Sequence, residues 1–144
     1  MKIENMNLEH LHKIENVLEN EFDNFWNYNI LKSELESENS KYIVAIEDSA
    51  VLGFAGILIL PDSTEITNIV VRKDKRKKGI GKLLLDRLIL ITKNINKESI
   101  SLEVNEKNEA AIKLYENAEF KKVGLRKKYY NNIDDAIIMT KKIV

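Results

Sequence analysis

At 144 residues, the chain is long enough for one domain with a substantial core and too short for two. Hydrophobic residues make up 44% and charged residues 32%, a balance typical of globular proteins. The lack of cysteine excludes disulfides, thiolate metal sites and cysteine nucleophiles, and two histidines (His10 and His12) offer little for a triad or a metal centre. We therefore expect a single domain over residues 1–144 with no metal.

The net charge is zero, but it is unevenly distributed. Residues 1–66 carry four Lys/Arg and thirteen Asp/Glu, a net −9, and residues 67–144 carry nineteen and ten, a net +9. The basic half is suited to an anionic cofactor and the acidic half to a cationic substrate. The basic run at 72–82 lacks interleaved aromatics, so we expect no nucleic-acid partner. No signal region or membrane-length apolar run is present, so we expect no membrane partner and a cytoplasmic location.

Hydrophobic periodicity predicts the elements in chain order. A first strand is followed by helices at 7–20 and 27–35 and then by strands at 42–47, 51–60 and 64–72. A helix runs from the glycines at 79–81 to about 93, a strand follows at 99–104, and another helix begins after Asn108. The last two strands, at about 120–125 and 134–142, are joined by a loop at 129–132. This order predicts an α/β (α+β) domain with a mostly antiparallel front and a parallel crossover.

A short basic loop joins the strand ending Ile69-Val70-Val71 to the next helix. The first N–H groups of that helix have no partners within it, and the helix dipole adds positive charge there. Gly79 and Gly81 remove the Cβ atoms that would keep a phosphate away. Lys77, Lys78 and Lys82 add full charges. These features predict a pyrophosphate site; the alternative is that the glycines serve tight packing alone.

The spacing of this loop excludes two other phosphate motifs. Leu83 follows Lys82 where a P-loop needs Ser or Thr, and Leu84 stands where a dinucleotide fingerprint needs its third glycine. The arrangement Arg76-x-x-Gly79-x-Gly81 instead resembles the coenzyme A loop of the GNAT acetyltransferases.

Three side chains are candidates for proton transfer during acyl transfer to an amine. Glu103 lies near the end of a strand, on the face opposite Leu102, and is a candidate base; the alternative is an exposed strand carboxylate. Glu65 is a second candidate base. Tyr115 is a candidate acid for the departing thiolate, and the alternative is a core tyrosine.

A longer resemblance covers residues 64–142. Leu102-Glu103-Val104 and the run from Asn108 to Phe120 are similar to the RimI-type ribosomal-protein-alanine N-acetyltransferases of the GNAT family. Asn68-Ile69-Val70-Val71, Tyr129-Tyr130 and Asp135–Met139 match as well.

The resemblance implies a fold and roles for individual residues. The fold would be a mixed sheet of about seven strands with about four helices, splayed between the strands of Val70 and Glu103, with acetyl-CoA in the gap. The backbone of Ile69, Val70 and Val71 would align the pantetheine. Residues 77–82, which include Ile80, would hold the pyrophosphate. Asn108 would contact the cofactor, Glu103 would accept a proton and Tyr115 would donate one.

The chain departs from the family pattern at two places. Glu119 stands where the family has a helix-ending glycine, and it would adopt the left-handed conformation at a cost of about 1 kcal/mol. Phe25-Trp26 lacks the family's intervening proline, in a region that forms part of the acceptor side.

The sequence is therefore interpreted as that of an acetyl-CoA-dependent N-acetyltransferase acting on the N-terminal amine of a protein, with a ribosomal protein as the acceptor that the resemblance suggests. One alternative is acetylation of a small amine such as a polyamine or amino sugar. Another is a non-catalytic acyl-CoA-binding regulatory domain.

Overall fold

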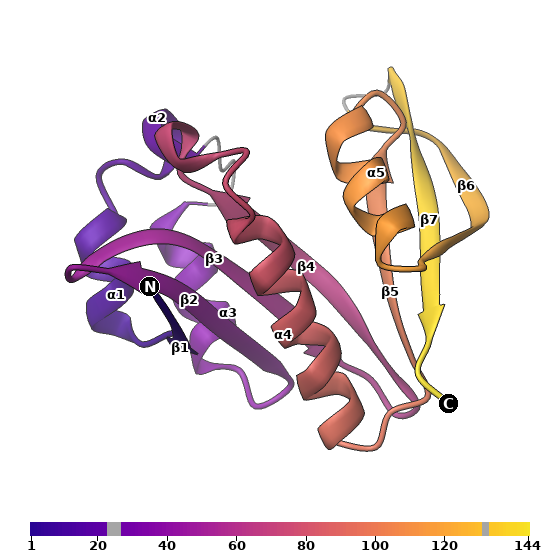
Figure 1. The fold of residues 1–144 in the computed structure, drawn as a ribbon, viewed down its shortest axis with the longest axis horizontal. Helices are drawn as coiled ribbons and strands as arrows, with labels where there is room; N and C mark the ends of the chain where they lie inside the picture. The colour runs from indigo at the N-terminus through magenta and orange to yellow at the C-terminus, as the bar shows by residue number, and fades with distance from the viewer. Residues whose placement is uncertain (23–26, 131–132) are drawn as a thin grey trace.

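A single mixed sheet of seven strands organises the chain, in the order β1-β2-β3-β4-β5-β7-β6 (Figure 1). The computed structural model describes residues 1–22, 27–130 and 133–144. The strands are β1 (Lys2–Asn5), β2 (Ser40–Glu47), β3 (Ala50–Ile59), β4 (Ser63–Val71), β5 (Ser99–Asn105), β6 (Lys121–Tyr130) and β7 (Asp134–Lys142). The helices are α1 (Leu8–Ile14), α2 (Leu18–Phe22), α3 (Tyr28–Glu36), α4 (Ile80–Asn94) and α5 (Glu109–Asn117), with a 3-10 turn, η1, at Lys73–Lys75.

The predicted α/β class and the seven-stranded mixed sheet are confirmed. Asn27 and Asn108 cap α3 and α5 as predicted, each accepting a hydrogen bond from a backbone N–H three residues later. The turn at Asp48-Ser49 places both residues at positive φ, 51° and 66°, the conformation of a tight hairpin between twisted strands.

Two predicted boundaries are wrong. The helix expected at 7–20 is two helices, α1 and α2, separated by a turn at 15–17, so the described residues form five helices instead of about four. Ile14, Leu18 and Phe22 are buried on both sides of that turn, so the apolar spacing continues through the break and does not reveal it. Strand β6 also runs to Tyr130, well past the expected end at 125, and includes Tyr129-Tyr130, which were expected in a loop.

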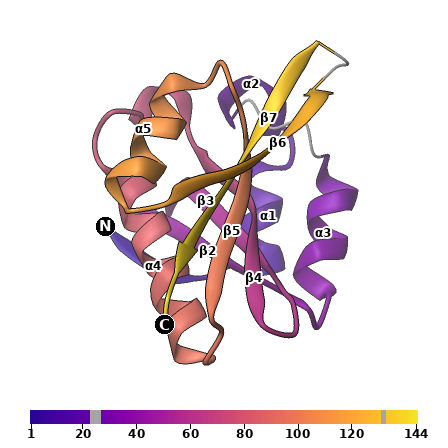
Figure 2. The same cartoon turned by 90° about the vertical axis from the view of Figure 1, so that its right-hand side faces the viewer.

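Helices cover both faces of the sheet (Figure 2). One core cluster lies between the sheet and α4 and α5, and includes Ile66, Leu84, Leu88 and Leu102. The other core cluster lies on the face covered by α1, α2 and α3, and includes Leu11, Phe22, Leu31 and Phe54. A buried residue on β2, β3 or β4 therefore faces one of two different helix layers, and its position in the alternation decides which one.

The sheet is split between β4 and β5. These strands pair in parallel at three positions only, the last of them Glu65 with Ser101. Beyond that point β4 continues to Val71 and β5 to Asn105, and the two strands diverge (Figure 1). β4 remains paired with β3 through Val71, so the split opens on one edge of β4 alone.

A bulge in β4 lies just beyond the last β4–β5 pair. The register with β3 shifts between Gly56 and Ile57, which leaves Thr67 as the extra residue between Ile66 and Asn68. Bulges bend a strand and increase its twist. This bulge therefore accounts for the divergence of β4 from β5.

Helix α5 ends at Asn117 with Ala118 as its C-cap, and Glu119 follows with φ at 70°. Glu119 therefore adopts, despite the strain, the left-handed conformation for which the family has a glycine at this place. The chain then turns directly into Phe120, whose side chain is buried. The strain affects the end of the helix and leaves the site on β5 unchanged.

Candidate active site

The start of α4 lies at the open end of the split. Gly79 precedes the helix in the left-handed conformation, with φ at 84°, and no side chain among the described residues caps the helix there. The first helical bond runs from the N–H of Leu83 to the carbonyl of Gly79 at 3.1 Å. The N–H groups of the first three residues, Ile80 to Lys82, have no acceptor within the helix and are suited to bind an anion.

Gly81 lies where β4, α4 and α5 approach one another. A Cβ built on Gly81 would lie 3.7 Å from the Leu114 side chain of α5 and 3.9 Å from the Val71 side chain of β4. Both are ordinary van der Waals distances. The residue therefore has room for a methyl group, and anything larger would extend into the split.

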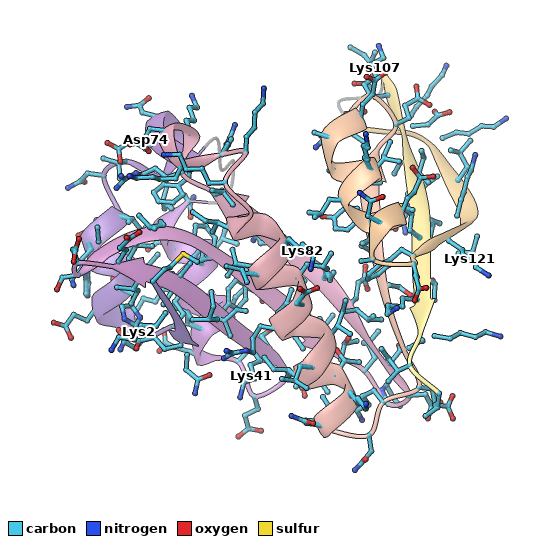
Figure 3. The ribbon with its side chains drawn as sticks, viewed as in Figure 1. Lys2, Lys41, Asp74, Lys82, Lys107 and Lys121 are labelled. Atoms are coloured by element: carbon cyan, nitrogen blue, oxygen red, sulfur yellow. The ribbon has the colours of Figure 1, made fainter. Side chains whose placement is uncertain are left out.

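The basic residues of this loop have different partners. Lys82 donates to Asp86 one turn later, with 2.7 Å between Nζ and Oδ2, and Arg76 donates through Nε to the carbonyl of Val71 at 3.0 Å. Lys77 and Lys78 are exposed. Figure 3 shows Lys82 on α4 and Lys107 at the far end of the β5–α5 half. Arg76 thus braces the loop against the end of β4, a role that the sequence did not reveal.

The edge of β4 facing the split has no strand partner beyond Glu65, although the carbonyl of Val71 accepts a hydrogen bond from Arg76. The N–H of Arg72 bonds to Leu52 on β3 at 2.8 Å, and Val70 pairs with Phe54 of the same strand. Because backbone groups point alternately to either side of a strand, those of Ile69 and Val71 point away from β3 and toward the split. Three residues are predicted to align the pantetheine. The backbone groups of Ile69 and Val71 point toward the split, whereas those of Val70 pair with β3.

Glu65 and Glu103 lie on the same face of the sheet. Thr64 and Ile66 face α4, since Thr64 shares a 2.8 Å hydrogen bond with Thr92 of that helix, so Glu65 points to the other face. On β5, Leu102 and Val104 are buried with the α4 core, which places Glu103 on that other face as well. Both candidate bases therefore lie on the sheet face opposite α4, the face on which α1 and α3 pack against β3 and β2.

The carboxylate of Glu103 forms an ion pair with Arg126 of β6. Oε1 lies 2.7 Å from Nη2 of Arg126, and the side chain of Glu103 is 17% exposed whereas that of Arg126 is 54% exposed. The sequence pattern gave no sign of Arg126, because the predicted strand ended at 125. No local motif signals the contact, since it joins residues 23 positions apart in sequence across β7.

Tyr115 is buried on the α4 side of the sheet. It is 8% exposed, its ring lies 5.8 Å from that of Phe120, and it belongs to the core cluster that contains Ile80 and Val104. Burial of this kind is typical of a core tyrosine, the alternative considered above. Tyr115 shares its core cluster with Ile80, at the start of α4. Tyr115 and Glu103 thus lie on opposite faces of the sheet, both in the half of the molecule that β5 and α5 form beside the split.

The start of α5 is polar and exposed. Asn108 accepts a hydrogen bond from the N–H of Ala111 at 3.2 Å through its side-chain oxygen, and its side chain is otherwise at the surface. Nearby, Asp134 accepts from the Asn105 amide at 3.1 Å and pairs with Lys107 at 3.1 Å. The Asn105 hydrogen bond and then the Lys107 ammonium lower the pKa of Asp134, so this carboxylate stays ionised beside the helix start.

A second polar cluster borders the bulge in β4. The hydroxyl of Tyr42 lies 3.0 Å from that of Thr67 and 3.4 Å from the Asn68 amide. Burial raises the pKa of Tyr42, with smaller opposing effects from these two hydrogen bonds. Sequence reasoning missed this cluster because Tyr42 reads as an ordinary strand residue.

Several predicted features fall outside the described residues. Phe25-Trp26 and the loop Asn131-Asn132 are among them, and so are the side chains of Tyr129 and Tyr130. Within the residues that are described, no group of three or more His, Cys, Asp or Glu side chains is placed to hold a metal ion. None of the helices in those ranges has the length and apolar character needed to span a bilayer.

A split seven-stranded sheet with an uncapped, glycine-led helix at its opening is the architecture of acetyltransferases that use a coenzyme A thioester. Residues 6–120 match the family described as "Acetyltransferase (GNAT) family", and the chain belongs to that family. It is an N-acetyltransferase, and the acetyl donor of this family is acetyl-CoA.

Comparisons with individual proteins agree with this assignment. The chain is 31% identical over 139 residues to a Bacillus subtilis (strain 168) protein provisionally named a ribosomal protein bS18-alanine N-acetyltransferase, covering 95% of this chain and 92% of that one. The crystal structure of the ribosomal-protein-S18-alanine N-acetyltransferase from Escherichia coli superposes with a TM-score of 0.89 at 27% identity, covering 99% and 93%. Arabidopsis thaliana NAA60 in complex with acetyl-CoA shares the fold, with a TM-score of 0.86 at 18% identity, covering 99% and 98%.

Proposed function

We propose that this chain, acting as one domain over residues 1–144, transfers the acetyl group of acetyl-CoA to the N-terminal α-amine of a protein. The observation that carries the proposal is the split between β4 and β5. It leaves the N–H groups of Ile69 and Val71 without a partner on β5, beside a helix start at Gly79 that is open to an anion. The names of the Bacillus and Escherichia relatives support a protein N-terminus as the acceptor.

The residues around the split fit acetyl-CoA. The N–H groups of Ile80, Gly81 and Lys82 would bind its pyrophosphate, with the charges of Lys77 and Lys78 beside them. Ile69 and Val71 would hydrogen-bond the pantetheine as an added strand would. The exposed side chain of Asn108 would make a further contact at the start of α5. Bound acetyl-CoA supplies a thioester whose carbonyl carbon the amine attacks.

Two side chains would move protons. An N-terminal amine has a pKa near 8, so most of it is protonated at pH 7 and needs a base. Glu103 would take that proton first, so that the free amine attacks the carbonyl carbon, the C–N bond forms and the C–S bond breaks; the second N–H proton then leaves to solvent. Tyr115 would donate its hydroxyl proton to the departing thiolate. Glu65, on the same face as Glu103, is the second candidate for the base, and the mechanism requires no metal ion.

The acceptor would approach from the face covered by α1, α2 and α3, because both candidate bases point there. Residues 1–66, which supply those helices, carry a net charge of −9. This charge favours peptides that carry basic residues. The preference for a small first residue follows from the alanine in the names of the relatives. The charge would also attract a polyamine, so a small amine remains the second candidate acceptor.

Release of free CoA, measured with a panel of acceptors, tests this function. We expect turnover of peptides that have a free small first residue followed by basic residues, and slower turnover as salt rises, because salt screens the attraction. An N-terminally blocked peptide of the same sequence with internal lysines is the matched control and should be a poor acceptor. Acetylation of spermidine with no activity on free N-termini would instead assign a small-amine enzyme. Acetyl-CoA binding without turnover of any acceptor would assign a regulatory domain.

A further inference from the structure

Arg126 and Glu103 form a close charge contact on the face of the sheet where the acceptor is proposed to bind. The 2.7 Å distance between Nη2 and Oε1 is that of a charge-assisted hydrogen bond. The two residues lie on different strands, separated by β7, and the register places Glu103 opposite Ile138 and Arg126 opposite Ala136. Arg126 therefore reaches diagonally over β7 to contact the proposed base.

The environment of this pair differs from that of an ordinary surface ion pair. Exposed pairs contribute little because water and salt screen them and both side chains are mobile. Here the carboxylate is 17% exposed, so it is mostly shielded, while the guanidinium is 54% exposed and has solvent on one side. Removing the guanidinium would leave a mostly buried carboxylate without this donor, and its orientation would change.

The pairing of β6 with β7 fixes the backbone position of Arg126. β6 has an irregularity in its pairing with β7 between Arg126 and Tyr130, and Lys128 within it has φ at 51°. The N–H of Lys128 donates to the Asp135 carboxylate of β7 at 2.7 Å, which holds the irregular segment in place. The last regularly paired residue before it is Arg126. Its backbone is thus fixed on one side by the β7 ladder and on the other by this bond.

We infer that Arg126 is a positioning residue for Glu103, holding the carboxylate of the proposed base correctly oriented toward the acceptor amine. The inference rests on the proposed function, because it assigns Glu103 the role of base. Arg126 itself forms no bond to the reacting atoms in this scheme. Arg126 contacts one oxygen of Glu103. Replacing Arg126 should therefore change kcat only while residue 103 has a carboxylate.

A set of matched variants tests this role. Arg126→Met removes the guanidinium, Arg126→Lys keeps a charge, and Lys122→Met removes an exposed charge from the same strand as a control. We expect Arg126→Met to lower kcat by about 10- to 100-fold, the cost of a misplaced catalytic group, with the KM for acetyl-CoA within twofold of wild type. Arg126→Lys should recover part of the loss, and Lys122→Met should behave as wild type.

The decisive comparison uses the background of Glu103→Gln. If Arg126 acts through the carboxylate, the double variant Glu103→Gln/Arg126→Met should be no slower than Glu103→Gln alone. Guanidinium at millimolar concentration should partly restore Arg126→Ala and leave Glu103→Gln unchanged. A rescue of this kind would not follow from a structural role.

Each outcome has one meaning. Multiplicative losses in the double variant, or Arg126→Met as active as Lys122→Met, would overturn the positioning role while leaving the acetyltransferase function intact. A wild-type enzyme inactive on every acceptor would overturn both. If Arg126→Met fails to fold, Arg126→Lys decides: full activity with an unchanged melting temperature contradicts the inference, and a kcat loss in a folded protein supports it.

Discussion

Gly56 of β3 lies directly against the ring of Tyr42 on β2. A Cβ placed on Gly56 would be 2.3 Å from the ring carbon Cζ and within 2.5 Å of both Cε atoms. The strand register pairs these two residues, so the ring lies flat over the glycine. The same ring carries the hydroxyl that reaches Thr67 and Asn68 at the bulge of β4. The size of residue 56 thus controls a contact beside the split.

The first prediction concerns this contact. Gly56→Ala should lower the free energy of unfolding by about 1–3 kcal/mol, because the methyl group must displace a buried ring. Urea denaturation measures the change. Tyr42→Leu should reduce the penalty of Gly56→Ala in the double variant, since the smaller side chain leaves room for the methyl group. Additive losses would contradict the steric explanation.

The second prediction concerns acetyl-CoA. Gly81→Glu should abolish its binding in calorimetry, because it places bulk and negative charge where the pyrophosphate is expected. Gly81→Ala is the matched control: its methyl group would lie at ordinary distances from Leu114 and Val71, so affinity should be nearly kept. Equal affinity of Gly81→Glu and wild type would remove the proposed pyrophosphate site.

The third prediction separates the two candidate bases. Glu103→Gln should lower kcat/KM by about 10²–10⁴ near neutral pH, with acetyl-CoA affinity nearly kept. Glu65→Gln is a matched control, since that carboxylate lies on the same face of the neighbouring strand. If Glu103→Gln remains within about threefold of wild type while Glu65→Gln loses activity, the base is Glu65; such losses are in the range of general base catalysis.

The fourth prediction concerns Tyr115. Tyr115→Phe keeps the ring that packs against Phe120 and removes only the hydroxyl. We expect a folded protein with a melting temperature close to that of wild type and a clearly lower kcat, because the thiolate loses its proton donor. Loss of folding with unchanged turnover of the folded fraction would show instead that Tyr115 is a structural core residue.

The fifth prediction concerns the end of α5. Glu119→Gly should raise the free energy of unfolding by about 1 kcal/mol, because glycine adopts the positive φ of this position without strain. The variant also loses a 3.4 Å ion pair with Lys141, in which the Glu119 side chain is 84% exposed. Glu119→Ala loses the same ion pair and keeps the strain, so it should be no more stable than wild type.

Local sequence signals predicted most elements and the start of α4 after Gly79. Gly79, Asn27 and Asn108 occupy the helix starts where their chemistry places them. The alternation of Ser99 to Val104 predicted correctly that Glu103 lies opposite the α4 core. These predictions succeeded because each depends on residues close together in the chain.

The sequence did not reveal one helix break and two contacts between distant segments. The break between α1 and α2 leaves the apolar spacing unchanged, so it has no signal in the pattern. The pairing of Arg126 with Glu103 depends on the register of β6, β7 and β5, and the Tyr42 cluster depends on the bulge at Thr67. Neither register nor bulge could be read from a single strand.

The short ladder between β4 and β5 has a consequence for stability. Had the pairing continued to Val71, the sheet would gain several backbone hydrogen bonds, each contributing about 1 kcal/mol net, and it would lose its opening. The protein therefore leaves part of its own sheet unformed. A ligand that completes those bonds contributes to folding as well as to binding, so a saturating donor should raise the melting temperature and slow amide exchange at Ile69 and Val71.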